Sequence, residues 1–149
     1  LIIVKGEPIV IEYNVRMGDP ETEVVIPRIK SDLVELFQAV ADGNLDKVTL
    51  EIDKRSATTV MLVSGGYPED YEKGKVISGL DKVEDSLVFH AGTKTSENGN
   101  VLTNGGRVMV LTGMARNLQS ARQKSQKMAK RVKFKNKYYR TDIGNDVLG

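Results

Sequence analysis

RVMVLTGMARNLQSARQKSQKMAKRV, residues 107–132, is the stretch that decides the fold. Its first part, residues 107–112, is a run of mostly apolar residues that is typical of a buried strand. From Asn117 onward, apolar or small side chains recur at spacings of three and four, which predicts a helix with one packed face. These positions are Leu118, Ala121, Ser125, Met128 and Val132. Arg and Lys occupy half of the other positions, so we expect an α+β fold in which this long helix packs on a sheet through its apolar stripe.

Several short β-rich segments precede this stretch and predict a small, mostly antiparallel sheet. We place them at residues 57–64, 75–78, 86–94, 100–103 and 107–112. Asn98-Gly99 is a strong hairpin signal. Residues 64–68, which contain Gly65-Gly66 and Pro68, predict a turn that ends the first of these strands.

The pattern differs before residue 50. Residues 1–4 and 9–16 predict the two strands of a hairpin around a turn at residues 5–8. Asp19 and Pro20 favour the start of a short helix that extends to about residue 26, and Ser31 favours the start of a second helix that ends at Gly43. We therefore expect two parts, residues 1–49 and residues 50–149, the second being the sheet domain with one long C-terminal helix.

The composition excludes several classes of protein. The chain has 149 residues, no cysteine, no tryptophan and one histidine. Disulfide scaffolds, thiol catalysis and zinc sites built from cysteine or histidine are therefore excluded. No apolar run approaches the roughly 18 residues of a membrane span, and no signal peptide opens the chain. We expect a soluble, cytoplasmic protein without a membrane partner.

Charge is distributed unevenly along the chain. Residues 115–149 carry 10 basic and 2 acidic side chains, a net charge of +8, whereas the whole chain has a net charge of only +2. The basic C-terminal segment motivates an alternative function, a non-catalytic nucleic-acid-binding module. Because the cations surround a helix with a regular apolar stripe, the solvated face of a packed helix is the stronger interpretation, and we expect no nucleic-acid partner.

Three polar residues alternate along the predicted strand 9–16. Glu12, Asn14 and Arg16 would share one face of this strand. Carboxylate and amide oxygens are ligands that suit Mg²⁺, and an Arg beside them can neutralise a phosphate that the metal bridges. From spacing alone, a solvent-exposed face with a surface Glu–Arg pair remains the more common arrangement.

Gly18-Asp19-Pro20-Glu21 follows this strand directly. The four residues predict a sharp turn into a helix N-terminus, where backbone N–H groups can bind an anion and acidic side chains can bind an amine. A plain helix cap is the alternative.

Residues 12–23, EYNVRMGDPETE, closely resemble the signature of the phosphoribosylamine–glycine ligase (glycinamide ribonucleotide synthetase) family, whose members are ATP-grasp enzymes. Val15 and Met17 depart from the usual signature, where small or aromatic residues often stand. Further segments resemble the family's C-terminal domain in order and spacing. They are residues 64–68, 74–77, 89–93, 103–108 and 138–144.

The resemblance implies a domain assignment. Residues 1–49 would be the C-terminal edge of an ATP-grasp domain, formed by a β-hairpin and helices, and residues 50–149 would be the ligase C-terminal domain. Leu1-Ile2-Ile3-Val4 opens the chain without an initiator Met, so we expect an excised piece of a longer enzyme. A naturally separate partner subunit is the alternative. The remaining N-terminal domains would be partners of this chain, and the chain alone is expected not to turn over because one wall of an ATP site cannot exclude water.

The resemblance also implies an activity. The family is an ATP-dependent carbon–nitrogen ligase of purine biosynthesis, which joins glycine to 5-phosphoribosylamine through glycyl phosphate and releases ADP and phosphate. By this resemblance, Glu12 and Asn14 bind Mg²⁺ or Mn²⁺, and Arg16 is the catalytic residue that stabilises the transferred phosphate. The pocket for glycine and phosphoribosylamine would be lined by Gly18, Asp19, Pro20 and Glu21.

A second candidate anion site lies in the predicted sheet domain. Gly105 and Gly106 allow a backbone to approach an anion closely, and Arg107 adds a guanidinium, as the phosphate of phosphoribosylamine would require. A Gly-rich turn with an exposed Arg is equally compatible with this short motif. For the lone His90 we expect a hydrogen-bonded structural role rather than acid–base catalysis.

Overall fold

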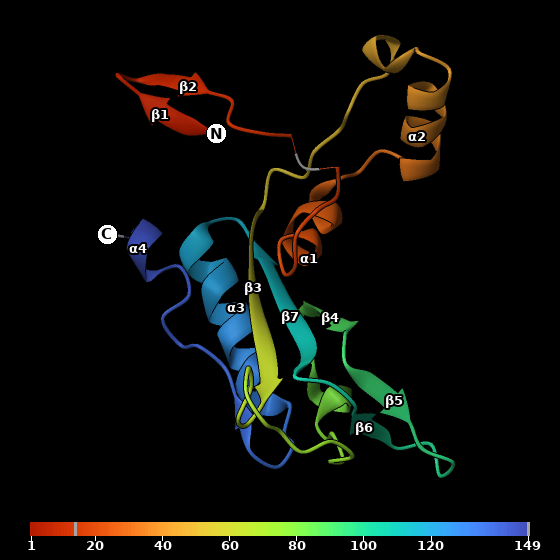
Figure 1. The fold of residues 1–149 in the computed structure, drawn as a ribbon, viewed down its shortest axis with the longest axis vertical. Helices are drawn as coiled ribbons and strands as arrows, with labels where there is room; N and C mark the ends of the chain where they lie inside the picture. Colours follow the sequence, from red (N-terminus) through yellow and green to blue (C-terminus); the bar gives the residue numbers. More distant parts are fainter. Residues whose placement is uncertain (14, 149) are drawn as a thin grey trace.

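The computed structural model describes residues 1–13 and 15–148 (Figure 1). The strands are β1 (Ile2–Val4), β2 (Glu7–Ile9), β3 (Ser56–Ser64), β4 (Ser86–His90), β5 (Thr93–Thr95), β6 (Val101–Thr103), β7 (Arg107–Ala115) and β8 (Lys137–Tyr138). The helices are α1 (Thr22–Val25), α2 (Leu33–Ala41), α3 (Leu118–Arg131) and α4 (Asn145–Leu148). Short 3₁₀ helices are η1 (Ile26–Arg28), η2 (Leu45–Lys47) and η3 (Leu80–Lys82).

A four-stranded sheet is the centre of the molecule. Its strand order is β4-β7-β3-β8, and every neighbouring pair is antiparallel. The two long strands β3 and β7 pair from Ser56↔Ala115 to Leu62↔Met109, and the register then shifts so that Val63 pairs with Arg107. This irregularity is a β-bulge, which bends a strand locally and increases its twist. It lies at the start of β7, directly after the predicted anion site at residues 104–107, which we call the anion loop.

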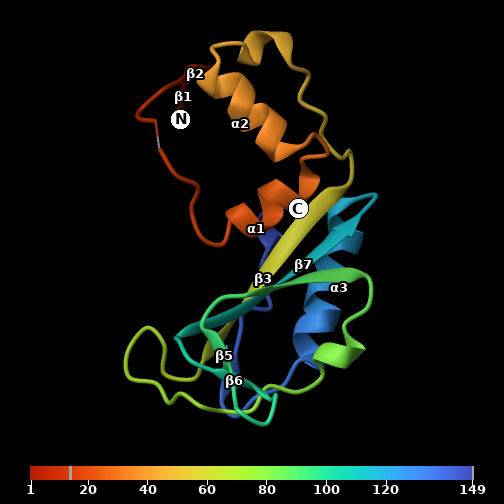
Figure 2. The same ribbon diagram turned by 90° about the vertical axis from the view of Figure 1, so that its right-hand side faces the viewer.

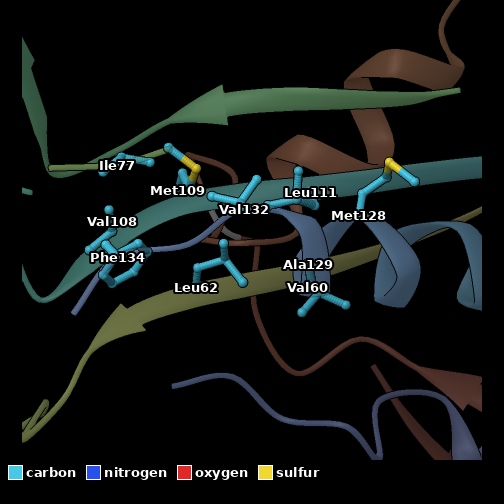
Figure 3. Packing of buried hydrophobic residues seen from close by; sticks show 10 residues of the cluster. All are labelled: Val60, Leu62, Ile77, Val108, Met109, Leu111, Met128, Ala129, Val132 and Phe134. Atoms are coloured by element: carbon cyan, nitrogen blue, oxygen red, sulfur yellow. The ribbon is translucent and has the colours of Figure 1, made fainter. Parts of the chain in front are cut away.

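The long helix α3 covers one face of this sheet (Figure 2). Val60, Leu62, Met109 and Leu111 of the sheet pack against Met128 and other residues of the helix and of the segment that follows it (Figure 3). Gly113 allows this close approach, because a Cβ at that position would lie 2.4 Å from Ala121 O. The helix and the α+β fold predicted from residues 107–132 are confirmed, and Asn117 caps the helix by accepting a hydrogen bond from Ser120 N at 2.8 Å.

The opposite face of the sheet receives α1. Alternation along β3 and β7 places the neighbours Thr59 and Thr112 on this face, away from the Val60–Leu111 pair. Thr112 Oγ1 donates to the backbone oxygen of Glu23 at 2.8 Å and lies 2.8 Å from Thr59 Oγ1. The segment before residue 30 is thus attached to the sheet through a threonine hydroxyl.

Several element boundaries differ from the sequence prediction. Strand β2 ends at Ile9, and neither residues 10–13 nor Val15 and Arg16 belong to a strand, so the predicted strand 9–16 is wrong in its extent. A strand needs a neighbour for its backbone groups, and β1 supplies one only for residues 7–9. The predicted strand 86–94 divides into β4 and β5, and residues 75–78 form only isolated bridges.

The helix starts in the N-terminal part also differ. Asp32, rather than Ser31, is the N-cap of α2 and accepts from Val34 N at 2.7 Å. Ser31 instead links the start of this helix to the segment before β3, because its hydroxyl donates to Thr49 O and accepts from Glu51 N. Helix α1 begins at Thr22, so Asp19 does not cap it and Pro20 does not open it.

In the described part of the chain, no helix is both long and apolar enough for a bilayer crossing.

Candidate functional site

The turn at residues 18–21 is closed by its own hydrogen bonds. Gly18 N donates to Glu21 Oε1 at 2.8 Å, and Thr22 Oγ1 donates back to Gly18 O at 2.7 Å. The Glu21 carboxylate therefore faces its own turn. Helix α1 has only four residues, so the predicted anion site at a helix N-terminus has little dipole behind it. Of the acidic side chains here, Asp19 is the one that reaches outward to another segment.

The loop at residues 104–107 is held against two other segments. On one side, Ser64 N donates to Gly106 O at 2.8 Å and Ser64 Oγ donates to Gly105 O at 2.9 Å. On the other side, Gly92 O accepts from Asn104 N, and Gly92 N donates to Arg107 O at 2.8 Å. The Gly-rich loop is thus fixed between the end of β3 and the corner between β4 and β5.

Arg107 and Asp19 join these two segments. Arg107 Nη1 lies 3.1 Å from Asp19 Oδ2, and the two side chains are 46% and 41% exposed. A half-exposed ion pair stabilises a fold by only about 0–1 kcal/mol. The ion pair matters for the geometry, because it brings together the turn at residues 18–21 and the loop at residues 104–107. Each of these was predicted separately as part of a substrate site. The guanidinium remains accessible for a further anion.

Glu23 provides the attachment of the turn to the sheet. Its backbone oxygen accepts the Thr112 hydroxyl described above, and its own Oε2 is buried with no hydrogen-bond partner among the described residues. A buried carboxylate oxygen without a partner is uncommon in folded proteins. Glu23 closes the signature at residues 12–23 but was not predicted to be a site residue.

Of the residues on the predicted metal-binding face, Glu12 and Arg16 do not lie on a strand. Glu12 lies outside any strand and is exposed, and Asn14 lies outside the described residues. Arg16 donates to the neighbouring Met17 O at 3.2 Å. Among the described residues, Glu12 makes no hydrogen bond or ion pair, and no group of three or more Asp, Glu or His side chains could hold a metal ion. The two metal ligands and the role of Arg16 stay predictions.

Glu12 nevertheless fits part of what Mg²⁺ requires. The ion usually takes one or two carboxylates, keeps several waters and completes its shell with substrate phosphates. A single accessible carboxylate on an open segment is compatible with that mode and incompatible with a closed protein cage. The described residues alone do not form a complete metal site.

Lys137 supports the sheet side of the anion loop. In β8 it pairs with Ser64, and its Nζ donates to Ala129 O and Val132 O at the C-terminal end of α3. Burial lowers the pKa of this ammonium group, and the positive charge of Lys133 adds to the effect. Lys137 therefore connects the helix end to the strand that carries Ser64.

His90 lies at the corner where β4 ends. Its Nδ1 is 3.0 Å from Thr93 Oγ1, and the residue is exposed. This hydrogen bond across the corner agrees with the structural role expected for a lone histidine.

Ser64, Tyr67 and Gly92 are further parts of the candidate site that were not predicted from the sequence. The sequence assigned Ser64 and Tyr67 to a turn, and residues 65–68 do form one. A Cβ added to Gly106 would lie 2.1 Å from Tyr67 Cδ2, so this ring occupies the space beside the loop. One feature of the sequence could have indicated Ser64. Alternate residues of β3 are buried, namely Thr58, Val60, Leu62 and Ser64, so a serine rather than an aliphatic residue ends the buried face.

Together, these features define a class of protein, a small α+β domain whose antiparallel sheet is covered by one long helix and presents a glycine-rich, arginine-bearing loop toward an acidic turn. Residues 57–146 match the family described as "Phosphoribosylglycinamide synthetase, C domain". The chain belongs to this family.

Similar proteins include phosphoribosylamine–glycine ligases and a bifunctional purine biosynthetic protein. The phosphoribosylamine–glycine ligase of Vibrio vulnificus (strain CMCP6) is 46% identical over 141 residues, which are 93% of this chain and 33% of that protein. The bifunctional purine biosynthetic protein PUR2,5 of Pichia angusta is 48% identical over 143 residues, which are 94% of this chain and 18% of that protein.

A solved structure agrees with these relatives. The crystal structure of the phosphoribosylamine–glycine ligase from Thermotoga maritima superposes with a TM-score of 0.73 at 35% sequence identity, and the match covers 95% of this chain and 34% of that one. The chain therefore spans about a third of the length of the ligases that it resembles.

Proposed function

We propose that residues 1–149 act as the C-terminal third of a phosphoribosylamine–glycine ligase. In the proposed reaction, the carboxylate of glycine attacks the γ-phosphate of ATP to give glycyl phosphate and ADP. The amine of 5-phosphoribosylamine then attacks the acyl carbon, and phosphate leaves as glycinamide ribonucleotide forms. The observation that supports the proposal is the ion pair between Asp19 and Arg107, which joins two segments of the ligase-like sequence.

Arg107 is the proposed ligand of the phosphate on phosphoribosylamine. A guanidinium offers five N–H donors in a planar arrangement, and its contact with Asp19 is at Nη1. This contact leaves other donors for the phosphate oxygens. The missing side chains of Gly105 and Gly106 leave room for Gly92 and the Tyr67 ring, which pack against the loop that carries Arg107.

The remaining N-terminal segment has proposed roles in phosphoryl transfer. Arg16 would neutralise charge on the transferred phosphate, as such reactions depend mainly on positioning and on charge stabilisation. Glu12 and Asn14 would hold Mg²⁺ or Mn²⁺, which supplies charge neutralisation at the phosphates of ATP when bound. Gly18, Pro20 and Glu21 would line the glycine side of the pocket.

The proposal assigns further partners to the rest of the longer enzyme. Its N-terminal domains would cover the nucleotide and complete the wall that this chain leaves open. The chain has no cysteine, which is compatible with the reducing cytoplasm as the compartment.

The nucleic-acid alternative receives little support from the basic helix. Arg122 donates to Thr141 O and Ile143 O, Arg131 donates to Lys82 O and pairs with Glu84, and Lys137 caps α3. These cations attach neighbouring segments to the helix. Tight, strongly salt-dependent binding to duplex DNA or RNA would favour the alternative over the ligase.

Arg107→Ala in the full-length enzyme tests the proposal. We expect the KM for 5-phosphoribosylamine to rise about 10- to 100-fold, the loss typical of one charge-assisted hydrogen bond, while the KM for ATP stays within about twofold. ADP release that depends on glycine and phosphoribosylamine is the measurement. Arg116→Ala, which removes an exposed Arg just beyond β7, is the matched control. An unchanged KM for phosphoribosylamine in the Arg107 variant would remove Arg107 from the site, and a wild-type enzyme without this ADP release would refute the function itself.

A further inference from the structure

Ser64 holds the anion loop with both of its hydrogen-bond donors. It is 3% exposed at the end of β3. Its hydroxyl donates to Gly105 O at 2.9 Å and its backbone N–H to Gly106 O at 2.8 Å. One buried residue therefore satisfies two successive carbonyl groups of the loop and sets the orientation of two successive peptide planes.

This control matters because the two loop residues are glycines. A glycine adopts positive and negative φ with similar ease, so a Gly-Gly pair has no preferred backbone conformation of its own. The packing around the loop limits its position, since a Cβ on Gly92 would lie 2.6 Å from Gly105 Cα. Packing alone does not choose which way a peptide plane faces, whereas a hydrogen bond to its carbonyl does.

The orientation of the carbonyls determines where the amide groups point. A trans peptide is planar, with its C=O and N–H on opposite sides. Because Gly105 O faces Ser64, the N–H of Gly106 points away from Ser64. The same hydrogen bonds set the position of the backbone from which the Arg107 side chain departs.

We propose that Ser64 is a positioning residue for phosphate recognition, which orients the Gly105–Gly106 peptide and through it the base of Arg107, without touching the substrate. The inference rests on the proposed function and deepens it, because it concerns the same phosphate site. It predicts that the Ser64 hydroxyl contributes to the affinity for the phosphate-bearing substrate and acts through Arg107.

Thr58 provides a matched control on the same strand. It lies six residues before Ser64 on the same face of β3 and is 6% exposed. Its Oγ1 has no hydrogen-bond partner among the described residues. Loss of a buried hydroxyl from β3 can therefore be compared at two positions, one that contacts the loop and one that does not.

The experiment uses the full-length enzyme with Ser64→Ala, Thr58→Val, Arg107→Ala and the double variant Ser64→Ala/Arg107→Ala. We expect Ser64→Ala to raise the KM for 5-phosphoribosylamine about 5- to 10-fold, the range of one net hydrogen bond, with the KM values for ATP and glycine within about twofold. Thr58→Val should leave all three KM values within about twofold. In the Arg107→Ala background, Ser64→Ala should change the KM by less than about twofold, because its effect passes through Arg107.

Other outcomes would overturn the inference. Equal changes in all three KM values would indicate a general structural role, and a full 5- to 10-fold effect in the Arg107→Ala background would show that Ser64 acts elsewhere. If Ser64→Ala does not fold, Ser64→Cys keeps the size with a much weaker donor and should show the same selective rise in KM. An active wild type with an unchanged Ser64→Ala KM would refute this inference alone, whereas an inactive wild type would refute the proposed function.

Discussion

The sheet with α3 and the N-terminal 50 residues place their apolar side chains in opposite environments. In the sheet, Leu62, Met109 and Leu111 are fully buried, and the packed cluster continues into α3. In the N-terminal part, the large apolar side chains from Leu1 to Ile11 are exposed, and in α2 Phe37 is 66% and Val40 58% exposed. One part has its core within the chain, whereas the other presents apolar surface to its surroundings.

This difference indicates which contacts maintain each part. The sheet and α3 are stabilised by burial of apolar surface, which is the main driving force of folding. The N-terminal part is attached to the sheet by a few polar contacts, such as those of Glu23 O with Thr112 Oγ1 and of Asp19 with Arg107. We therefore expect the free energy of unfolding to depend on the sheet and to depend little on the exposed apolar residues.

Leu62→Ala should have the largest effect. Truncation of a fully buried Leu removes contacts and leaves a cavity, so we expect a loss of about 3 kcal/mol in the free energy of unfolding. The same change at Leu50, which is 52% exposed, should cost less than about 0.5 kcal/mol. Urea denaturation followed by circular dichroism measures both. Similar losses at the two positions would mean that the N-terminal part shares the core.

Lys137→Met should have an intermediate effect, because it removes an ammonium group that donates to two carbonyls at the end of α3. Hydrogen bonds from a charged group are worth more than neutral ones, and we expect a loss of about 1–2 kcal/mol in the same denaturation experiment. Lys135→Met is the control, since Lys135 is exposed two residues earlier. If both variants lose the same stability, the cap does not stabilise the helix end.

Asp53 should show the smallest effect, confined to acid. Its carboxylate accepts hydrogen bonds from the Arg55 side chain and backbone, which lower its pKa from 3.8 to about 2. A carboxyl whose pKa falls on folding stabilises the folded state above pH 4 and loses this contribution as the pH falls toward 2. An NMR titration should give a pKa of about 2 for Asp53, and a higher value in Arg55→Gln. An Asp53 pKa that Arg55→Gln does not raise would show that the two residues do not pair in solution.

The spacing of apolar residues correctly predicted the strands and the helix that form the hydrophobic core. The residues at spacings of three and four in 118–132 do face the sheet, and β3 and β7 were correctly placed because each is a long run of residues buried by its neighbours. Strand 9–16 failed because its alternating polar and apolar residues say nothing of whether a neighbouring strand is available. In α2, the helix was predicted correctly, but helical spacing does not determine burial, since Phe37 is 66% exposed.

The site was predictable only in part. The sequence placed Asp19 and Arg107 in two separate candidate sites, and no local pattern could bring residues so far apart in sequence to 3.1 Å. Ser64 escaped prediction because a serine before two glycines is typical of a turn, and its contact with the loop depends on the register between β3 and β7. That register, with its bulge, is a property of the assembled sheet.

The hydroxyl of Thr112 has one proton and donates it in a hydrogen bond to Glu23 O. Thr59 must therefore be the donor to Thr112 Oγ1, so the hydrogen bonds run in one direction from the sheet to α1. The sheet thus binds the segment that carries Asp19 by presenting the Thr112 hydroxyl as a donor to the Glu23 carbonyl. Serine at position 112 would preserve this complementarity, whereas valine would leave both the Thr59 hydroxyl and the Glu23 carbonyl unmatched.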